Sequence, residues 1–489
     1  MNRCVLALDQ GSHASRACLF DESGRLCASA SVPVATTRRG AAEVEQDPQE
    51  LLHSLRAAAA QAAAAAIAQQ PRLQIVAAGL AVQRSTIVCC ARADGRALSP
   101  ALSWQDHRNA RWLQRLAPHA ARIRELTGLP LSAHYGASKL RWCLEHLPQV
   151  ATAAAAGELL AAPLATYLAL HLRDGAASDA RTARVDAANA GRTLLFDSMR
   201  LDWSDELLGL FALERAWLPR HAPTRDDWGT LSLAGRDVPL RAVTGDQSAV
   251  PYAEAAADPA TLYVNLGTGA FIQRPLRARP PSPAPLLGSV LYRDAAAAIY
   301  SLEGTVNGAG AAVSWFCERE RCDEQALWKA LETLDAGAPL PLFLNGIGGL
   351  GSPWWRPLVE SRFIGAADAA SGTDQTLLRF AAVIESIAFM IAANAALLVR
   401  QGGAPLRILL AGGMSRSHWL CRRLAALLEL PVQVGAAEAS ARGVARLAAP
   451  ELAAGWPAPA SQGWQPERDD VLPDRYRRFL EALDSSATR

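Results

Sequence analysis

Apolar runs that end in glycine-containing turns recur along this chain. Residues 4–8 form a continuous apolar run, as in a strand that is buried on both faces. The polar segment 9–16 follows, and further apolar or alternating runs cover 17–20 and 25–34. The pattern predicts a hairpin of strands whose turn contains Gly11. This turn differs from a Walker loop because no helix follows it.

A second copy of this pattern lies past the middle of the chain. A strand-like run over 261–266 enters a polar glycine turn at 267–269 and resumes at 271–272. We interpret the two copies as an internal duplication, with two α/β domains that each begin with a hairpin. Coincidence is the alternative, because strand–glycine–strand segments are common.

Helix signals separate the strand-like runs. Asp47-Pro-Gln-Glu50 has an N-cap residue, a proline at the first helical position and a glutamate three residues on, and the alanine-rich segment to Gln69 continues the helix. An apolar stripe predicts another helix over 374–400. The remaining expected elements are strands at 73–82, 87–91, 193–196, 238–243 and 406–410, helices through residue 170 and over 419–428, a loop region over 341–364 and a helical tail.

One carboxylate follows a strand at a position suited to chemistry. The run from Val238 to Val243 stops at Gly245, Asp246 comes next, and small residues suited to a helix start follow. Open α/β sheets bind ligands beyond the carboxyl ends of their strands, so Asp246 is predicted to lie at the mouth of a cleft. The alternative for Gly-Asp alone is a solvated turn.

Two glycine turns have the donors of a phosphate site. The first offers successive backbone amides, the Ser12 hydroxyl and the Arg16 cation, which together could form an anion nest. Asp9 beside a phosphate would be repulsive unless Mg²⁺ lay between them, so Asp9 is the metal candidate, acting through water. The second turn offers Thr268 as donor. A plain hairpin turn is the alternative for both.

Two other glycine-rich segments have different interpretations. Ala411-Gly-Gly413 allows close backbone approach to a flat group such as a nucleoside, although a strand-to-helix turn is the commoner use. Residues 346–351 match the G-x-G-x-x-G pattern. We reject a dinucleotide site there, because Pro353 prevents the required helix and no acidic residue follows about twenty positions on. A loop that lines a cleft is expected instead.

Composition indicates an ordinary soluble protein of several domains. The 489 residues are half hydrophobic and one-fifth charged, with a net charge of +2, which gives no sign of nucleic-acid binding. Nine scattered cysteines lack zinc spacing and are expected to be reduced thiols. Asp9 comes too early for a signal peptide, and the alanine-rich stretches 57–68 and 150–165 are too weakly apolar for membrane spans. We therefore expect a cytoplasmic protein without a membrane partner.

An ordered set of motifs resembles the FGGY carbohydrate kinases, within the sugar kinase–Hsp70–actin superfamily, and is most similar to their glycerol kinase branch. The motifs are Ala7-Leu-Asp-Gln-Gly-Ser12, Gln83-Arg84, Trp104-Gln-Asp-His-Arg108, Gly191-Arg-Thr-Leu-Leu-Phe-Asp197, Gly245-Asp-Gln-Ser248, Asn265-Leu-Gly-Thr-Gly-Ala-Phe271, Leu302-Glu-Gly-Thr305, Glu385-Ser-Ile-Ala388 and Ala411-Gly-Gly-Met-Ser-Arg416. The resemblance extends from residue 5 to about 448.

The resemblance implies two ribonuclease-H-like α/β domains that close over a central cleft. We place the first at 1–241, the second at 242–450 and a tail at 451–489. The implied activity is Mg²⁺-dependent transfer of phosphate from ATP to a sugar or polyol hydroxyl, with Asp246 as the catalytic base. Substrate contacts are expected at Arg84, Ser85, Trp104, His134, Asp246, Gln247 and Phe271. Nucleotide contacts are expected at Ser12, His13, Arg16, Gly267, Thr268, Gly310, Ser314, Gly412, Gly413 and Ser417.

Several positions depart from the glycerol kinase pattern. Ser85 stands where that branch has glutamate, and His134 where it has a tyrosine that clasps glycerol. A carboxylate that accepts from two substrate hydroxyls is a large part of polar specificity. Its loss favours a polyol or ketose other than glycerol, with glycerol as the alternative. Ser314 replaces glutamine and Ser417 replaces asparagine near the nucleotide, which should alter adenosine contacts without changing the use of ATP.

Two other classes were weighed against the kinase. An actin-like or Hsp70-like ATPase would have no use for the segments 83–84 and 104–106 that the resemblance assigns to a sugar pocket. A pseudokinase scaffold is disfavoured because Asp9 and Asp246 are both present. The sequence leaves the identity of the substrate open, and a homodimer and a homotetramer are both open for the assembly.

Overall fold

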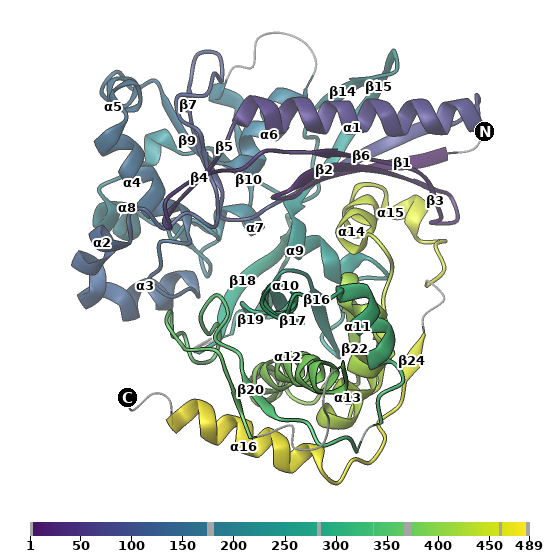
Figure 1. Cartoon of the computed structure of the whole chain (residues 1–489). Coiled ribbons are helices and arrows are strands. Elements are labelled where there is room, and N and C mark those ends of the chain that lie inside the picture. Colours follow the sequence, from purple (N-terminus) through teal and green to yellow (C-terminus); the bar gives the residue numbers. More distant parts are fainter. Residues whose placement is uncertain are drawn as a thin grey trace.

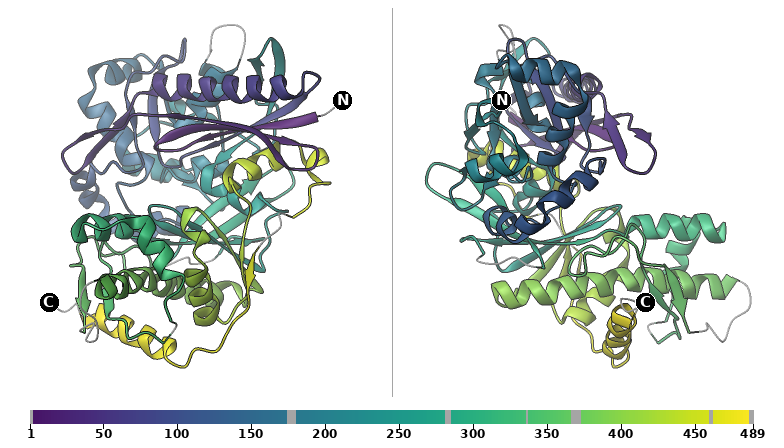
Figure 2. Two further views of the ribbon diagram at one scale, coloured as in Figure 1. Left: turned by 45° about the vertical axis from the view of Figure 1, so that its right-hand side comes forward. Right: turned by 90° about the vertical axis from the view of Figure 1, so that its left-hand side faces the viewer.

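The chain folds into two lobes, each built on a mixed sheet with helices against it. The computed structural model describes residues 3–173, 180–280, 285–335, 337–365, 373–458 and 462–485. The N-terminal lobe, purple to teal in Figure 1, stacks on the C-terminal lobe, which is green to yellow. Figure 2 shows the same two layers from the side. This arrangement confirms the predicted two-domain α/β class.

The N-terminal sheet has the strand order β14-β15-β6-β1-β2-β3. Its strands are β1 (Arg3–Gln10), β2 (Ala14–Asp21), β3 (Leu26–Pro33), β6 (Gln74–Val82), β14 (Thr230–Leu233) and β15 (Arg236–Gly245). The strands β1, β2 and β3 are antiparallel, whereas β6 runs parallel to both β1 and β15. The first hairpin is therefore the one that the apolar pattern predicted.

The C-terminal sheet repeats this topology, in the order β18-β19-β17-β16-β22-β23-β24. Its strands are β16 (Thr261–Leu266), β17 (Ala270–Leu276), β18 (Leu287–Arg293), β19 (Ala298–Val306), β22 (Arg407–Ala411), β23 (Val432–Val434) and β24 (Gly463–Trp464). The series β19-β17-β16-β22-β23 matches β3-β2-β1-β6-β15 in order and in strand direction. The two glycine turns, from which an internal duplication was inferred, thus lie in two sheets with the same order and direction of five strands.

Three helices account for the buried faces of these sheets. The helix α1 (Pro48–Gln69) packs on β2 and β3, and α12 (Thr373–Gly402) packs on β17 and β19. The helix α14 (Ala439–Ala448) returns from the C-terminal lobe to cover the other face of the N-terminal sheet, against β1, β6 and β15. Because helices cover β1 on both faces, residues 4–8 are all buried, which explains their continuous apolar run.

The start of α1 gives a first testable prediction. The side chain of Asp47 accepts a hydrogen bond from the Gln49 amide, and Pro48 occupies the first turn. Replacing Asp47 with alanine should lower the free energy of unfolding by about 1 kcal/mol, because one end amide of the helix loses its partner. Urea denaturation of wild type and Asp47→Ala measures this difference, and Asp47→Ser, which keeps a capping oxygen, should recover most of it.

The remaining elements form an insertion in the N-terminal lobe and the outer layers of the second lobe. The insertion contains β4 (Thr37–Arg39), β5 (Glu43–Gln46), β7 (Ile87–Ala91), β8 (Ala101–Leu102), α2 (Ala110–Leu113), α3 (Ala120–Thr127), α4 (Gly136–His146), α5 (Pro148–Ala155), β9 (Leu159–Pro163), α6 (Leu164–Leu172), β10 (Arg184–Asp186), α7 (Ala187–Ala190), β11 (Phe196–Asp197), β12 (Asp202–Trp203), α8 (Asp205–Phe211) and β13 (Arg220–Ala222). After it come α9 (Asp246–Ala249), the 3₁₀ turn η4 (Val250–Tyr252), α10 (Gly310–Glu320), α11 (Glu324–Leu331), β20 (Leu342–Leu344), β21 (Arg362–Ile364), α13 (His418–Leu428), α15 (Pro450–Ala453) and α16 (Leu472–Ser485).

The structure differs from the expected elements in a few places. The region predicted as helical through residue 170 is interrupted by β9, which is fully buried and pairs with β7, so tertiary pairing overrides the helical propensity of its alanines. The loop region 341–364 contains the short pair β20 and β21. The boundary expected between residues 241 and 242 falls within β15, and the division into domains stays a prediction.

Two helices are long and apolar enough to cross a membrane by length and composition alone. These are the segments Pro48–Gln69 and Gln375–Gly402, and 50% and 83% of their most apolar windows are buried inside the protein. Both helices pack on a sheet, as core helices of folded domains do.

Candidate active site

The strand register brings the candidate residues of the N-terminal lobe to one edge of the sheet. Gln10 and Gly245, at the ends of β1 and β15, both pair with Val82 at the end of β6. The residues beside or after these three strand ends therefore meet at the carboxyl edge, where open sheets bind ligands. Asp246 begins α9 there.

Two carboxylates of this edge interact electrostatically. Burial raises the pKa of Asp246, and the nearby charge of Arg84 acts in the opposite direction. The pKa of Asp9 rises to about 7, mainly through burial and secondly through the charge of Asp246. Two neighbouring carboxylates in a cleft favour a bound cation or a proton between them. Asp9 and Asp246 thus form the electronegative centre of the site.

A buried ion triad lies beside Asp246 and joins the two lobes. Glu303, on β19 of the C-terminal sheet, is fully buried and accepts hydrogen bonds from Arg84 Nη1 and Nη2 at 3.1 and 3.2 Å. Arg192, just after α7, pairs with the same carboxylate. Burial raises the pKa of Glu303, but Arg192 and Arg84 outweigh this effect and lower it to about 2. The triad therefore remains ionised at every ordinary pH.

Gly245 permits this arrangement. A Cβ atom added at Gly245 would lie 2.6 Å from Cγ and Cδ of Arg84, so the arginine stem crosses directly over the residue before Asp246. Sequence reasoning named Arg84 as a substrate contact but assigned no role to Glu303 or Arg192, although both lie in motifs that it singled out. Their pairing is a long-range contact that the sequence alone does not reveal.

Three of the predicted substrate contacts form one wall. The ring of Trp104 lies 5.6 Å from that of His134, and Trp104 Nε1 donates to Ser12 Oγ at 2.8 Å. Ser85 has a left-handed backbone (φ 65°), and its hydroxyl is buried without a hydrogen-bond partner among the described residues. Ser12, predicted to contact the nucleotide, hydrogen-bonds Trp104 and Gln83 in the structure.

A buried lysine ties two segments of this wall together. Lys139 Nζ, on α4, donates to the carbonyl oxygens of Ser85 at 3.0 Å and His134 at 2.7 Å. The side chain is almost fully buried, and burial lowers its pKa to about 7. Sequence reasoning missed this role, because a lysine inside a helix gives no signal of the carbonyls it will meet.

The remaining predicted substrate contacts lie where the lobes meet. Gln247 Oε1 accepts from Asn265 Nδ2 at 3.1 Å, and its backbone oxygen accepts from Gln273 Nε2 at 3.0 Å. Phe271 is half-buried on β17 and pairs with Asn265 across the hairpin. The segment after Asp246 is thereby fixed to the first hairpin of the C-terminal sheet.

The C-terminal lobe contains a hollow of about 610 Å³ near the second glycine turn. Gly267, Gly413 and Ser417 line it, as the predicted nucleotide set requires. Ser417 Oγ donates to Glu332 Oε1 at 2.8 Å. The other lining residues are Leu266, Glu324, Trp328, Lys329, Glu332, Met414 and Arg416. Apolar, aromatic and charged side chains of this kind suit a nucleoside.

Other members of the predicted nucleotide set have structural partners. The amide of Gly310, at the start of α10, donates to Gly267 O at 3.0 Å, and Thr268 is exposed on the same turn. Gly412 has φ 92°, and a Cβ there would lie 2.3 Å from Leu266 O. Gly412 thus makes a close approach to β16, whereas a Cβ at Gly413 would meet no atom of the described residues within 4 Å. Both glycines stay predicted nucleotide contacts.

The last three members lie away from the hollow. Arg16 is exposed and pairs with Glu438 at 3.2 Å, so its charge is partly compensated by α14's N-cap residue. His13 is exposed on the first turn, and Ser314 is exposed on α10. None of the three lines the hollow of the C-terminal lobe among the described residues.

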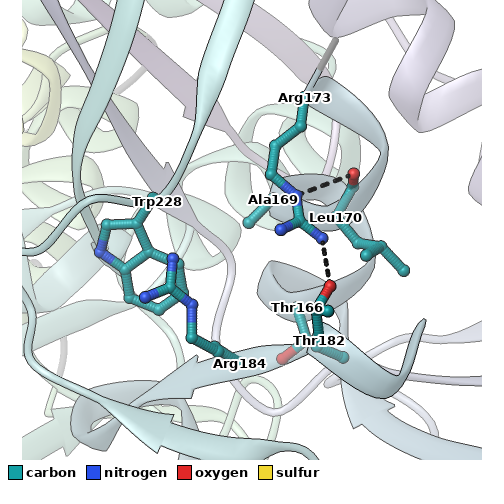
Figure 3. A pocket seen from close by; sticks show the side chains of 8 residues that line it. Thr166, Ala169, Leu170, Arg173, Thr182, Arg184 and Trp228 are labelled. Carbon is teal, nitrogen blue, oxygen red and sulfur yellow. Dashed lines mark hydrogen bonds between the residues drawn. The ribbon is translucent and has the colours of Figure 1, made fainter. Parts of the chain in front are cut away.

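A much smaller cavity lies in the N-terminal lobe, between α6 and β10. Figure 3 shows Arg173 donating to Leu170 O and to Thr182 Oγ1, beside Arg184 stacked on Trp228. The cavity volume is about 10 Å³, which is room for about one water molecule. It is too small for a substrate.

Comparison with known proteins identifies the family. The N-terminal domain of the FGGY family of carbohydrate kinases matches residues 4–261, and its C-terminal domain matches 262–452. The glycerol kinase of Methylobacterium nodulans is 33% identical over 99% of this chain and 95% of its own, and that of Aromatoleum aromaticum is 33% identical over 98% of each.

Solved structures agree with this assignment at the level of fold. Plasmodium falciparum glycerol kinase with ADP superposes with a TM-score of 0.88 at 20% identity, over 99% of this chain and 98% of that one. The xylulose kinase of Rhodospirillum rubrum gives 0.83 at 21% identity, over 99% of both chains.

These relatives correct one expectation from the sequence. Ser85 and His134 favoured a polyol or ketose other than glycerol, but the full-length relatives at about 33% identity are glycerol kinases. One missing carboxylate at residue 85 is therefore not enough to exclude glycerol as the substrate. In the structure the Ser85 hydroxyl is itself buried and unpartnered among the described residues, so the site retains a polar group there. The chain belongs to the FGGY family of carbohydrate kinases and is an ATP-dependent phosphotransferase that acts on a hydroxyl group.

Proposed function

We propose that this protein is a glycerol kinase, which transfers the γ-phosphoryl group of ATP to a hydroxyl of glycerol. The full-length similarity to glycerol kinases is the observation that supports the substrate. The placement of Asp246 at the carboxyl edge of the N-terminal sheet, beside Arg84, supports the chemistry. The expected nucleotide position is the hollow lined by Gly267 and Gly413.

Asp246 acts as the general base in this proposal. The glycerol hydroxyl gives its proton to the Asp246 carboxylate while its oxygen forms a bond to the γ-phosphorus and the bond to the β-phosphate oxygen breaks. The products are phosphorylated glycerol and ADP. The raised pKa of Asp246 makes it a stronger proton acceptor than an ordinary carboxylate. The charges of Arg84 and Arg192 oppose this shift and favour the ionised carboxylate.

Asp9 is the residue that we assign to Mg²⁺, through water. Among the described residues no group of three or more histidine, cysteine or acidic side chains could bind a metal ion. Mg²⁺ keeps several waters and uses one or two carboxylates together with the phosphates of its nucleotide, a role that the Asp9 carboxylate beside Asp246 suits. Bound there, the ion would neutralise charge on the phosphates. The positive charge would also offset the repulsion between the carboxylates of Asp9 and Asp246.

The wall formed by Ser85, Trp104 and His134 would receive the carbon skeleton and hydroxyls of glycerol. Trp104 offers an apolar face, and the Ser85 hydroxyl can donate or accept. Burial and the charge of Lys139 keep the pKa of His134 well below its usual range, so its imidazole is neutral and can also donate or accept. These groups suit an uncharged polyol.

A coupled assay of ADP release tests the proposed substrate. Purified protein is given ATP, Mg²⁺ and in turn glycerol, other polyols, pentuloses, hexuloses or sugar acids, with ADP release in the absence of an acceptor as the baseline. Glycerol should give the highest kcat/KM, and mass spectrometry should detect glycerol phosphate. A higher kcat/KM for any other acceptor would refute glycerol as the substrate.

Lys139 gives a prediction about this wall. In Lys139→Met the carbonyl oxygens of Ser85 and His134 lose their shared donor, so both segments should shift relative to each other. We expect the KM for glycerol to rise about tenfold, the equivalent of one hydrogen bond to a charged group, with a smaller change in the KM for ATP. Steady-state kinetics with each substrate varied measures the two effects separately. Equal changes in both KM values would contradict a local role of Lys139 in the glycerol wall, and partial unfolding would appear as a lower apparent kcat with both KM values unchanged.

We place the protein in the cytoplasm, where its co-substrate ATP is available. The similarity to kinases over the whole chain supports this location. The choice between a homodimer and a homotetramer stays open, and size-exclusion chromatography with light scattering decides it.

A further inference from the structure

A second large hollow lies at the junction of the two lobes, outside the cleft of the proposed kinase site. Its volume is about 430 Å³, within the range of small-molecule sites. It is bounded by α14, η4, the loop before β16 and the strands β17, β18 and β19. None of the residues assigned above to glycerol, nucleotide or Mg²⁺ lines it among the described residues.

The charged residues of this hollow are all of one sign. Arg225, Arg277 and Arg446 line it, and no acidic residue does so among the described residues. Arg225 has a distant partner in Glu451, at 3.7 Å, but both side chains are exposed, so that pairing contributes little. The wall is therefore electropositive.

Arg446 is the central observation. Among the residues that the structure describes, its buried Nη1 atom has no hydrogen-bond partner, and no carboxylate forms an ion pair with it. Its guanidinium lies over the ring of Trp456, 5.6 Å from the centroid. Burial lowers its pKa, with no opposing charge to offset that effect. Folded proteins rarely leave a buried guanidinium nitrogen unsatisfied, and an anion in the hollow would supply the missing partner of this half-buried side chain.

The uncharged residues that line the hollow indicate that the anion has a carbon skeleton. The ring centroids of Tyr252 and Tyr292 lie 5.9 Å apart, and the buried hydroxyl of Tyr252 has no hydrogen-bond partner in the described part of the chain. The tyrosines and the small apolar residues suit a carbon skeleton, and the unsatisfied hydroxyl offers one more donor. The apolar residues are Ala255, Ala256, Ala257, Pro259, Leu276, Ile299, Leu447, Pro450 and Ala453.

We propose that this hollow is a binding site for a small organic phosphate, with its phosphate on Arg446 and Tyr252 and its carbon skeleton against the two tyrosine rings and the apolar wall. Arginine suits phosphate because its planar fork donates two parallel hydrogen bonds to the oxygens. The site adjoins the helical segment 246–252, which begins with the proposed base Asp246. Tyr252 ends the helical stretch that Asp246 begins, and Gly443 of α14 packs on Ala249 O so closely that a Cβ would lie 1.9 Å away.

Calorimetric titration with phenyl phosphate tests this site. Wild-type protein is saturated with ADP, Mg²⁺ and glycerol, so that the proposed kinase site is filled. Phenyl phosphate should bind with a stoichiometry of one, and Arg446→Gln should weaken its binding at least about tenfold, the equivalent of one charge-assisted hydrogen bond. Phenol, which lacks the phosphate, should bind far more weakly than phenyl phosphate.

A second pair of variants does not depend on removing a buried arginine. Ala256 is exposed at the rim, so both Ala256→Glu and Ala256→Gln should fold. The two new side chains have nearly the same shape, but only the glutamate repels an anion. Binding should be several-fold weaker in Ala256→Glu than in Ala256→Gln. The proposal is overturned if wild type does not bind phenyl phosphate under these conditions, or if all variants bind it within twofold of wild type.

Discussion

Replacing Asp246 by asparagine should lower kcat by about 10²–10⁴-fold, which is the usual contribution of a positioned general base. Asparagine has the same shape but cannot accept the hydroxyl proton. Asp246 is the first residue after β15, its Oδ1 accepts from the backbone amide of Gln247 at 2.7 Å, and the Gln247 side chain also donates to the carboxylate. The substitution should therefore leave the surrounding hydrogen bonds nearly unchanged.

The fold of Asp246→Asn should be at least as stable as that of wild type. Burial raises the pKa of Asp246, which means that folding disfavours its ionised form at neutral pH. A neutral amide removes this penalty and also the repulsion from Asp9. Thermal unfolding should show an unchanged or higher Tm, and ADP should bind as in wild type. A kcat within tenfold of wild type would rule out Asp246 as the base.

Asp9→Asn provides the matched comparison, because it changes the other carboxylate of the same pair. Its effect should depend on the metal: the Mg²⁺ concentration needed for half-maximal activity should rise, and high Mg²⁺ should restore part of the rate. Asp246→Asn should not respond to added Mg²⁺. If high Mg²⁺ rescued both variants equally, the separate roles assigned to base and metal carboxylate would be wrong.

The sequence predicted the parts of this site that depend on local pattern. The hairpin around Gly11, its copy around Gly267 and the strand that ends before Asp246 follow from apolar runs and glycine positions. The strand register brings the ends of β1, β6 and β15 side by side, and with them the residues that follow each strand. Local pattern and sheet topology were enough to bring Asp9, Arg84 and Asp246 to one edge.

The sequence could not predict contacts between segments far apart in the chain. Glu303 meets Arg84 and Arg192 only because the two sheets face each other, and Lys139 meets the Ser85 carbonyl only because α4 packs behind the loop after β6. The same limit applies to Gly412, whose close approach to Leu266 O also joins two segments far apart in the chain. The substrate was misjudged for a related reason, since single departures were weighed without their surroundings.

Replacing Glu303 by glutamine should lower the free energy of unfolding by about 3 kcal/mol at neutral pH. Two guanidinium groups, of Arg84 and Arg192, would then be buried without their carboxylate. Because all three side chains are buried, solvent cannot replace the lost charge. The triad also joins the two lobes, so the KM for glycerol should rise as Arg84 loses its fixed position. Calorimetric unfolding and steady-state kinetics measure the two effects.

The loss should depend on pH in a defined direction. Folding lowers the pKa of Glu303 from 4.5 to about 2, so its ionised form stabilises the native state. This stabilisation is fully present above about pH 4.5 and is lost as the pH falls toward 2. Linkage therefore predicts that the difference in unfolding free energy between wild type and Glu303→Gln is constant from about pH 6 to about pH 8. The difference should shrink as the pH falls below about 4.5.

An exposed ion pair supplies the control for burial. Glu206 accepts from Arg122 Nε and Nη2 at 2.8 Å each, in the same two-bond geometry, but both side chains are about half exposed. Water and salt screen such a pair, so Glu206→Gln should leave the unfolding transition nearly unchanged. If Glu206→Gln and Glu303→Gln destabilised the protein equally, burial would not be the reason for the effect. A large loss at Glu303 alone would show that the buried triad stabilises the junction of the lobes beside Asp246.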